Sequence, residues 1–225
     1  KTAVPIGVAI GMSSAVSMIC MIPADVSFAT SAQRIFAGSN SFSLIAIPFF
    51  ILAGNIMNNG GIATRLVNCA KVISGRMPGA LAQSNVVANM LFGAISGSGA
   101  AAAAAMGGTI GPLEEKEGYD KNYSTAVNVA SAPVGMLIPP SNTMIVYSSV
   151  AGSVSIAALF MAGYIPGLLW GGAVMILAGI MAKKRGYQAE QRVPVKVALK
   201  TFWQAIPSLL LIVIVIGGIL GGIFT

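Results

Sequence analysis

Two short polar segments interrupt apolar stretches of the sequence, and their residue types are suited to binding ions. Ser96-Gly97-Ser98-Gly99 separates the apolar runs 79–95 and 100–112, and Pro139-Pro140-Ser141-Asn142 divides the apolar run 123–150. Tandem prolines remove two backbone donors and disfavour helix at the preceding residue. Non-helical backbone at membrane depth must be satisfied by protein or by a watery cavity. Both segments are therefore candidates for lining a site.

The chemistry that such breaks suit is the binding of Na⁺ and of an anion. Carbonyl and hydroxyl oxygens of broken helices are suitable Na⁺ ligands, whereas helix N-termini attract carboxylates. We expect one helix to begin near Ala100 and another near Thr143, the second capped by Ser141 or Asn142, with the cation between the two turns. Each segment alone has a structural alternative, as a flexible loop, a kink or a close helix contact. Two breaks at similar depth favour a shared site.

The sequence offers few residues for acid–base chemistry within the membrane. The chain has no histidine, and we expect all six acidic residues in loops: Asp25, Glu114, Glu115, Glu117, Asp120 and Glu190. A proton relay and an intramembrane protease both lack their residues, and no nucleotide-binding Gly-x-x-x-x-Gly-Lys motif occurs. Cys20 and Cys69 define neither a disulfide nor a metal site. The sequence thus predicts no enzyme and favours Na⁺ over protons as the coupling ion.

The elements that would position these residues are membrane helices. Apolar residues make up 56% of the chain and charged residues 8%, with a mean hydropathy of +0.83. A soluble domain carries about 25% charged residues, so much of this surface must face lipid. The net charge of +7 gathers in two loops, which is the positive-inside pattern and not a nucleic-acid-binding face. These basic residues are Arg65, Lys71 and Arg76, then Lys183, Lys184, Arg185, Arg192, Lys196 and Lys200.

The apolar runs give the expected order of elements. We expect spans at Ala3–Ile22, Phe42–Met57 (kinked at Pro48), Tyr123–Val150, Ile156–Ala182 and from Trp203 onward. Asp25–Ser43 is expected as an external loop or interfacial segment, and Gln188–Lys200 as a second surface segment. Ile62–Ser74 is amphipathic, and fits equally an arm on the membrane surface or a linker helix packed on the bundle. Among Asn85, Asn89 and Asn128, helix-to-helix hydrogen bonding is the preferred role for Asn85.

Charge placement adds a topology for residues 79–112. With the loop Lys183–Lys200 on the cytoplasmic side, the run 123–150 starts inside. Arg65, Lys71 and Arg76 also fall inside only if residues 79–112 enter and leave on one side. The charges therefore predict a re-entrant hairpin, with its tip at Ser96-Gly97-Ser98.

Several motifs closely resemble the large membrane subunit of tripartite ATP-independent periplasmic (TRAP) transporters. They are the segment Ser41–Gly61, Ser96-Gly97-Ser98 followed by small residues, Ile138-Pro139-Pro140-Ser141, and Leu159–Gly167. The resemblance implies an all-α polytopic membrane protein with an elevator-type ion-transporter fold. It also implies a Na⁺-coupled importer of an organic acid in the bacterial inner membrane, of the sialic acid or C4-dicarboxylate class. Its partners would be a small four-helix membrane subunit and a periplasmic substrate-binding protein.

The resemblance also assigns the site residues. Ser96, Gly97, Ser98, Pro139, Pro140, Ser141 and Asn142 would together hold one Na⁺. Ser98, Asn142 and Thr143 are expected contacts of the solute, and Ser141-Asn142-Thr143 is similar to a signature of related dicarboxylate transporters. Asn89, an intramembrane polar candidate, is a further expected contact. One departure is the alanine run 100–105, which stands where the family carries an aspartate. Two other hypotheses are a stand-alone Na⁺/dicarboxylate-type symporter and a non-transporting membrane scaffold.

The implied domain organisation has four parts. Residues 1–78 would be scaffold spans and the arm, 79–150 the transport-domain hairpin and broken helix, and 151–200 a scaffold span with a cytoplasmic arm. Residues 201–225 would begin a second, inverted repeat that this sequence truncates.

Overall fold

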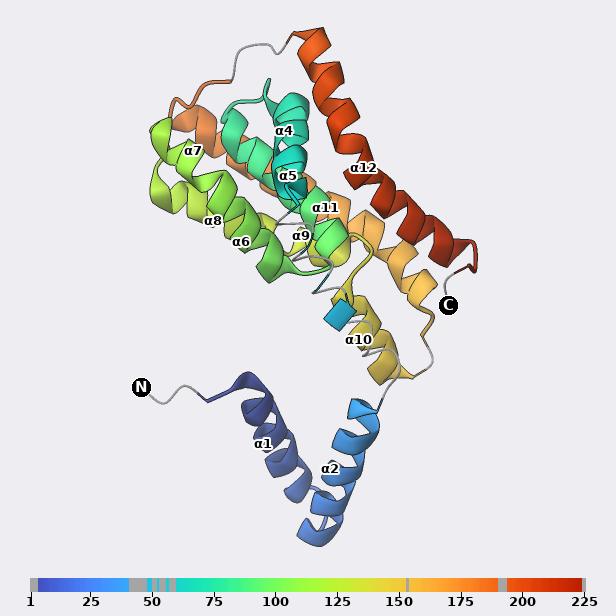
Figure 1. Ribbon diagram of the computed structural model, residues 1–225. Coiled ribbons are helices and arrows are strands. Elements are labelled where there is room, and N and C mark those ends of the chain that lie inside the picture. The colour runs from blue at the N-terminus through green and yellow to red at the C-terminus, as the bar shows by residue number, and fades with distance from the viewer. Residues whose placement is uncertain are drawn as a thin grey trace. The chain divides into compact units, whose positions relative to one another are not determined.

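The computed structural model describes residues 4–40, 48, 49, 52, 56, 60–152, 154–189 and 194–223 (Figure 1). The regular elements in these ranges are all helices. The chain divides into two compact units, Lys1–Ile45 and Ala46–Thr225. The expected span Phe42–Met57, with its kink at Pro48, lies almost wholly outside the described residues, and so does most of the motif Ser41–Gly61.

The first unit is a pair of helices that pack on each other, α1 (Ile6–Ile19) and α2 (Ala24–Ser39). Helix α1 is shorter than the expected span Ala3–Ile22, because it has 14 residues and reaches only about 21 Å. Pro23 disfavours helix at the residue before it and then forms the N-cap of α2. Of the segment Asp25–Ser43, expected as an external loop or interfacial segment, the part up to Ser39 is helical, with Asp25 in the first turn, where a negative charge is favourable.

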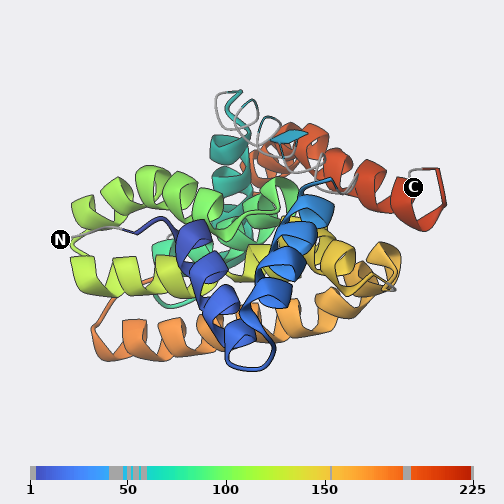
Figure 2. The same cartoon turned by 90° about the horizontal axis from the view of Figure 1, so that it is seen from below.

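The second unit is built around one buried helix. Its elements, labelled as in Figure 1, are α4 (Ile62–Ser74), α5 (Ala80–Ser96), α6 (Gly99–Thr109), α7 (Gly111–Lys116), α8 (Lys121–Ser131), α9 (Val134–Leu137), α10 (Asn142–Ala151), α11 (Ile156–Lys184) and α12 (Val195–Leu220). Almost every residue of α5 is buried, polar ones included, because α4, α6, α8, α9 and α11 all pack on it. Figure 2 shows α11 running along one side of this unit, next to α8.

Helix α4 is a linker packed on the bundle, which is one of the two alternatives for residues 62–74. Leu66, Val67 and Ala70 are buried against α5 and α12. Ile73, expected on the apolar face, is exposed. Apart from Ile73, the hydrophobic stripe of α4 therefore faces protein.

Helix α12 begins earlier than the expected span from Trp203. It begins at Val195, directly after the N-cap Pro194, and continues to Leu220. Residues 195–200 are thus helical and mostly exposed, and the expected boundary between residues 200 and 201 falls inside this helix. Residues 190–193 lie outside the described ranges.

Among the described helices, α11 and α12 are long and apolar enough to cross a membrane. The combination of α8–α9 with α10 passes the same criterion as one broken span, bent by 50° at the break. Many large side chains of α11 are exposed, including Ile165, Leu169 and Ile176. Such a surface suits lipid or another subunit, because exposed apolar patches of this size mark interaction with membrane or protein.

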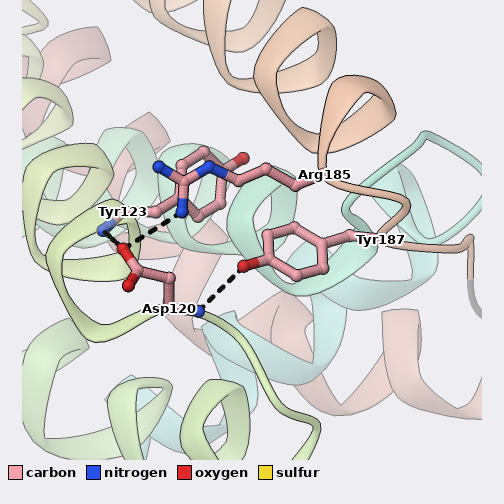
Figure 3. Close-up of polar contacts among 4 residues, drawn as sticks. All are labelled: Asp120, Tyr123, Arg185 and Tyr187. Carbon is pink, nitrogen blue, oxygen red and sulfur yellow. Dashed lines mark hydrogen bonds and ion pairs between the residues drawn. The ribbon is translucent and has the colours of Figure 1, made fainter.

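A polar clamp joins the start of α8 to the end of α11 (Figure 3). Asp120 caps α8 by accepting the Tyr123 N–H at 2.9 Å, and Arg185 Nη1 lies 3.1 Å from the same oxygen. The Tyr187 hydroxyl accepts the Asp120 N–H at 2.9 Å. The Tyr123 N–H, and after it Arg185, lowers the pKa of Asp120 because both favour the charged form. The clamp holds the broken span beside α11.

Candidate functional site

The first break is a tight turn between α5 and α6. Helix α5 ends at Ser96, and Gly97 follows with φ +62°, a conformation in which glycine is much preferred to other residues. Ser98 is extended and caps α6, its Oγ accepting the Ala101 N–H at 3.3 Å. Helix α6 then packs back along α5. Ser96-Gly97-Ser98 is thus the turn between two helices that pack on each other.

The second break separates α9 from α10. Ile138 is extended, Pro139 and Pro140 are joined by a cis peptide bond, and α10 begins at Asn142. Ser141 is fully buried and is the N-cap, its Oγ accepting the Met144 N–H at 3.4 Å. Of the two residues considered for this cap, Ser141 is therefore the one that serves.

The two breaks are in direct contact. The Asn142 N–H donates to the Gly97 carbonyl at 3.3 Å. A Cβ on Gly97 would lie 3.1 Å from the Asn142 N and 3.2 Å from the Pro140 O, so the two turns touch through their backbones. The serine-capped starts of α6 and α10 consequently lie next to each other.

One polar atom at this contact lacks a partner. Asn142 Oδ1 is buried and accepts no hydrogen bond from the described residues. A buried acceptor without a donor is costly, and a bound cation would remove that cost. The oxygen-rich chemistry of the two turns, with hydroxyl and carbonyl groups of Ser96, Ser98 and Ser141 close by, fits a hard cation such as Na⁺. The neighbouring Thr143 is exposed.

Helix α11 supports the second break through glycines of its Leu159–Gly167 motif. A Cβ at Gly163 would collide with the Leu137 carbonyl, and a Cβ at Gly167 would lie 2.8 Å from Ile138 Cγ1. Small residues one helical turn apart let backbones approach closely in membrane proteins. The motif therefore positions the break by its small size.

Asn89 does not join the other candidates at the breaks. It is fully buried on α5, about 10 Å along the helix from Ser96. Its Nδ2 lies 2.8 Å from Asn85 Oδ1, 2.9 Å from Asn128 Oδ1 and 2.8 Å from Ser131 Oγ. These bonds tie α5 to α8, which is the helix-to-helix role that was preferred for Asn85.

Glu114 corrects the expectation that every acidic residue lies in a loop. It belongs to α7, and its side chain is only 1% exposed, whereas Glu115 beside it is exposed. It lines a cavity of about 350 Å³ with Asn85, Ser124 and Asn128. A buried carboxyl group is thus present, and the expected lack of one no longer speaks against proton chemistry. Gly111-Pro112 is the sequence feature that indicates a helix here, because proline is favoured in the first turn of a helix.

Comparisons with known proteins agree with the motifs. The family described as "Tripartite ATP-independent periplasmic transporter, DctM component" matches residues 1–225. The uncharacterized protein YgiK of Salmonella typhimurium is 54% identical over 99% of this chain and 51% of its own length. The C4-dicarboxylate TRAP transporter large permease protein DctM of Vibrio cholerae is 41% identical, over 99% of this chain and 49% of its own. The sialic acid TRAP transporter large permease protein SiaM of the same organism is 38% identical, over 98% and 51%. The chain spans about half the length of these relatives.

Proposed function

The chain belongs to the DctM component family of tripartite ATP-independent periplasmic transporters, and from that premise we propose that it forms part of a Na⁺-coupled permease for an organic acid. The observation that carries the proposal is the contact between Gly97 and Asn142, which joins two helix breaks far apart in the sequence. Breaks of this kind form ion and substrate sites in secondary transporters.

Each residue of the two turns has a distinct part in the proposed site. Ser98 and Ser141 cap α6 and α10 and hold the first turns in place, so that two partially positive helix ends lie close together. Asn142 offers its unpaired Oδ1 to the cation, and the capped helix ends attract the carboxylate of the solute. Na⁺ supplies positive charge that strengthens binding of the anion. Thr143, exposed next to Asn142, is a proposed solute contact.

The substrate class, the partner subunits and the cellular location are proposed from the family. The relatives DctM and SiaM are named for C4-dicarboxylate and sialic acid, and we propose a substrate of this acidic class. A periplasmic binding protein would deliver it, a small membrane subunit would complete the permease, and the assembly would lie in the bacterial inner membrane. The hairpin and broken helix would move together as the transport domain in an elevator-type motion.

Reconstituted transport tests this proposal. The complete permease, with its small subunit and binding protein in proteoliposomes, is expected to accumulate the acid only when an inward Na⁺ gradient is present. Uptake that is independent of Na⁺ would contradict the coupling. Uptake without the binding protein would favour a stand-alone symporter, and no uptake of any acid that the binding protein holds would favour a scaffold.

The re-entrant course of residues 79–112 gives a second prediction. Single cysteines at Arg76 and Glu115, both exposed, are expected to react with a membrane-impermeant thiol reagent from the cytoplasmic side. A cysteine at Val150, 83% exposed in the last turn of α10, is expected to react from the opposite side. Cys20 and Cys69 are first replaced by alanine, and this background without added cysteines is the control. Labelling of Arg76→Cys and Glu115→Cys from opposite sides would refute the hairpin.

A further inference from the structure

We propose that the buried carboxyl group of Glu114 is a proton-binding site that reaches solution through the cavity between α5, α6, α7 and α8. The site is separate from the two helix breaks, and the inference stands independently of Na⁺ coupling. Helix α7 also lies outside the candidate spans.

The first support is that the carboxyl group of Glu114 is buried without an ion-pair partner among the described residues. Glu114 is 1% exposed and its carboxylate oxygens make no hydrogen bond of good geometry there, although the polar groups of Ser124 and Asn85 are near enough to favour the charged form. The ion pair between described side chains joins Arg185 to Asp120, so none reaches Glu114. An unpaired buried charge is strongly unfavourable, and a carboxyl group in that position is neutralised by binding a proton or another cation.

The second support is the way in. The cavity of about 350 Å³ has buried polar walls at Asn85, Glu114, Ser124 and Asn128, and an exposed rim at Pro112, Glu115, Lys121 and Thr125. A volume of this size holds several water molecules beside polar partners. Water can therefore carry protons between the rim and the carboxyl group.

The third support separates a proton from a metal ion. Ser124 Oγ and Asn85 Nδ2 are buried, line the same cavity and lack partners of their own. Asn85 Oδ1 accepts the Asn89 amide at 2.8 Å, so its other amide atom, Nδ2, is the one near the Glu114 carboxyl group. An amide nitrogen is a donor and does not coordinate a cation. The lining thus suits a carboxyl group that gains and loses a proton.

Burial, and not a neighbouring charge, sets the direction in which the pKa of Glu114 is shifted. Helices α5 and α6 contribute no titratable side chain, whereas α7 carries Glu115 and Lys116, the following loop Tyr119, and α8 Lys121 and Tyr123. Burial raises the pKa of Glu114, and the polar groups of Ser124 and Asn85 lower it by less. The folded protein therefore binds this proton more tightly than the unfolded chain does. The stabilising effect is fully present below the unfolded pKa and is lost as pH rises through the folded value.

Infrared difference spectroscopy of the complete permease tests the site without any transport. The wild type is expected to show a protonated carboxyl band that disappears on titration at a pH above that of an ordinary glutamate. Glu114→Gln is expected to lack this band, and Glu115→Gln, the exposed neighbour, to keep it. Ser124→Ala removes a group that lowers the pKa and is expected to move the titration to higher pH.

Several outcomes would overturn the proposal. They are a band that persists in Glu114→Gln, a wild type that titrates like a free glutamate, or a band removed by added Na⁺ at constant pH, which would indicate a metal-ion site. If Glu114→Gln does not fold, the wild type and Ser124→Ala still decide, because an unchanged titration in Ser124→Ala rejects the geometry. Failure of Na⁺-dependent uptake leaves this titration unaffected, so the two proposals fail separately.

Discussion

Gly93→Ala is expected to destabilise the permease strongly, because it adds a methyl group to a helix interface that has no room for one. The reason is contact between backbones, since a Cβ on Gly93 of α5 would collide with the Gly135 Cα of α9. Backbone atoms cannot rotate away as a side-chain end can, so α5 and α9 would have to separate. Overpacking of this kind costs about 1–3 kcal/mol. The shift would also pull the second break away from the first.

The measurement is the thermal unfolding of the detergent-solubilised permease, with Na⁺-dependent uptake as a second readout. Gly135→Ala, which approaches the same contact from α9, is expected to act in the same direction. Gly108→Ala is the matched control, because it lies in α6 with nothing within 4 Å of its Cβ. Alanine is the better helix former by up to about 1 kcal/mol, so this control is expected to be neutral or stabilising. Equal unfolding temperatures for Gly93→Ala and Gly108→Ala would contradict the close contact.

Asn142→Ala is expected to raise the Na⁺ concentration needed for half-maximal uptake by roughly tenfold, because a contact between a charged group and a polar partner contributes about 1.5–3 kcal/mol. The substitution removes the unpaired Oδ1 but keeps the backbone N–H that binds the Gly97 carbonyl. The turn is thus preserved while the proposed ligand is lost. Ser98→Ala is expected to act in the same direction by removing the cap of α6, which costs about 0.5–2 kcal/mol.

The control for these variants is Ser149→Ala, also on α10. The Ser149 hydroxyl donates to the Ile145 carbonyl inside its own helix at 3.0 Å, away from the break. Its Na⁺ dependence is expected to equal that of the wild type. Ser98→Thr retains a capping hydroxyl, so its Na⁺ dependence is expected to stay close to that of the wild type. Unchanged Na⁺ dependence in both Asn142→Ala and Ser98→Ala would return the two breaks to a purely structural role.

Where the helices are interrupted could be predicted from residues close together in the chain. Gly97 and Pro139-Pro140 end helices through their own backbone restrictions, and Ser98 and Ser141 start helices by bonding an amide three residues ahead. The same local reasoning overestimated the length of α1. The apolar run continues to Ile22, but the helix ends at Ile19, ahead of Pro23. The same reasoning placed the start of α12 too late, because the charged residues Lys196 and Lys200 precede the apolar run from Trp203.

The sequence by itself thus determined the membrane class, the two helix breaks and their caps, since composition and local backbone restrictions act within a few residues. Only the tertiary structure decided that Gly97 meets Asn142, that Asn89 bonds to α8 instead of joining the breaks, and that Glu114 is buried. Burial in a six-residue helix such as α7 depends on which helices cover it, and so short a helix has too few turns for a hydrophobic pattern. The packing of α5 and α8 around α7 therefore places the Glu114 carboxyl group in a polar cavity, although the sequence had suggested that Glu114 lies in a loop.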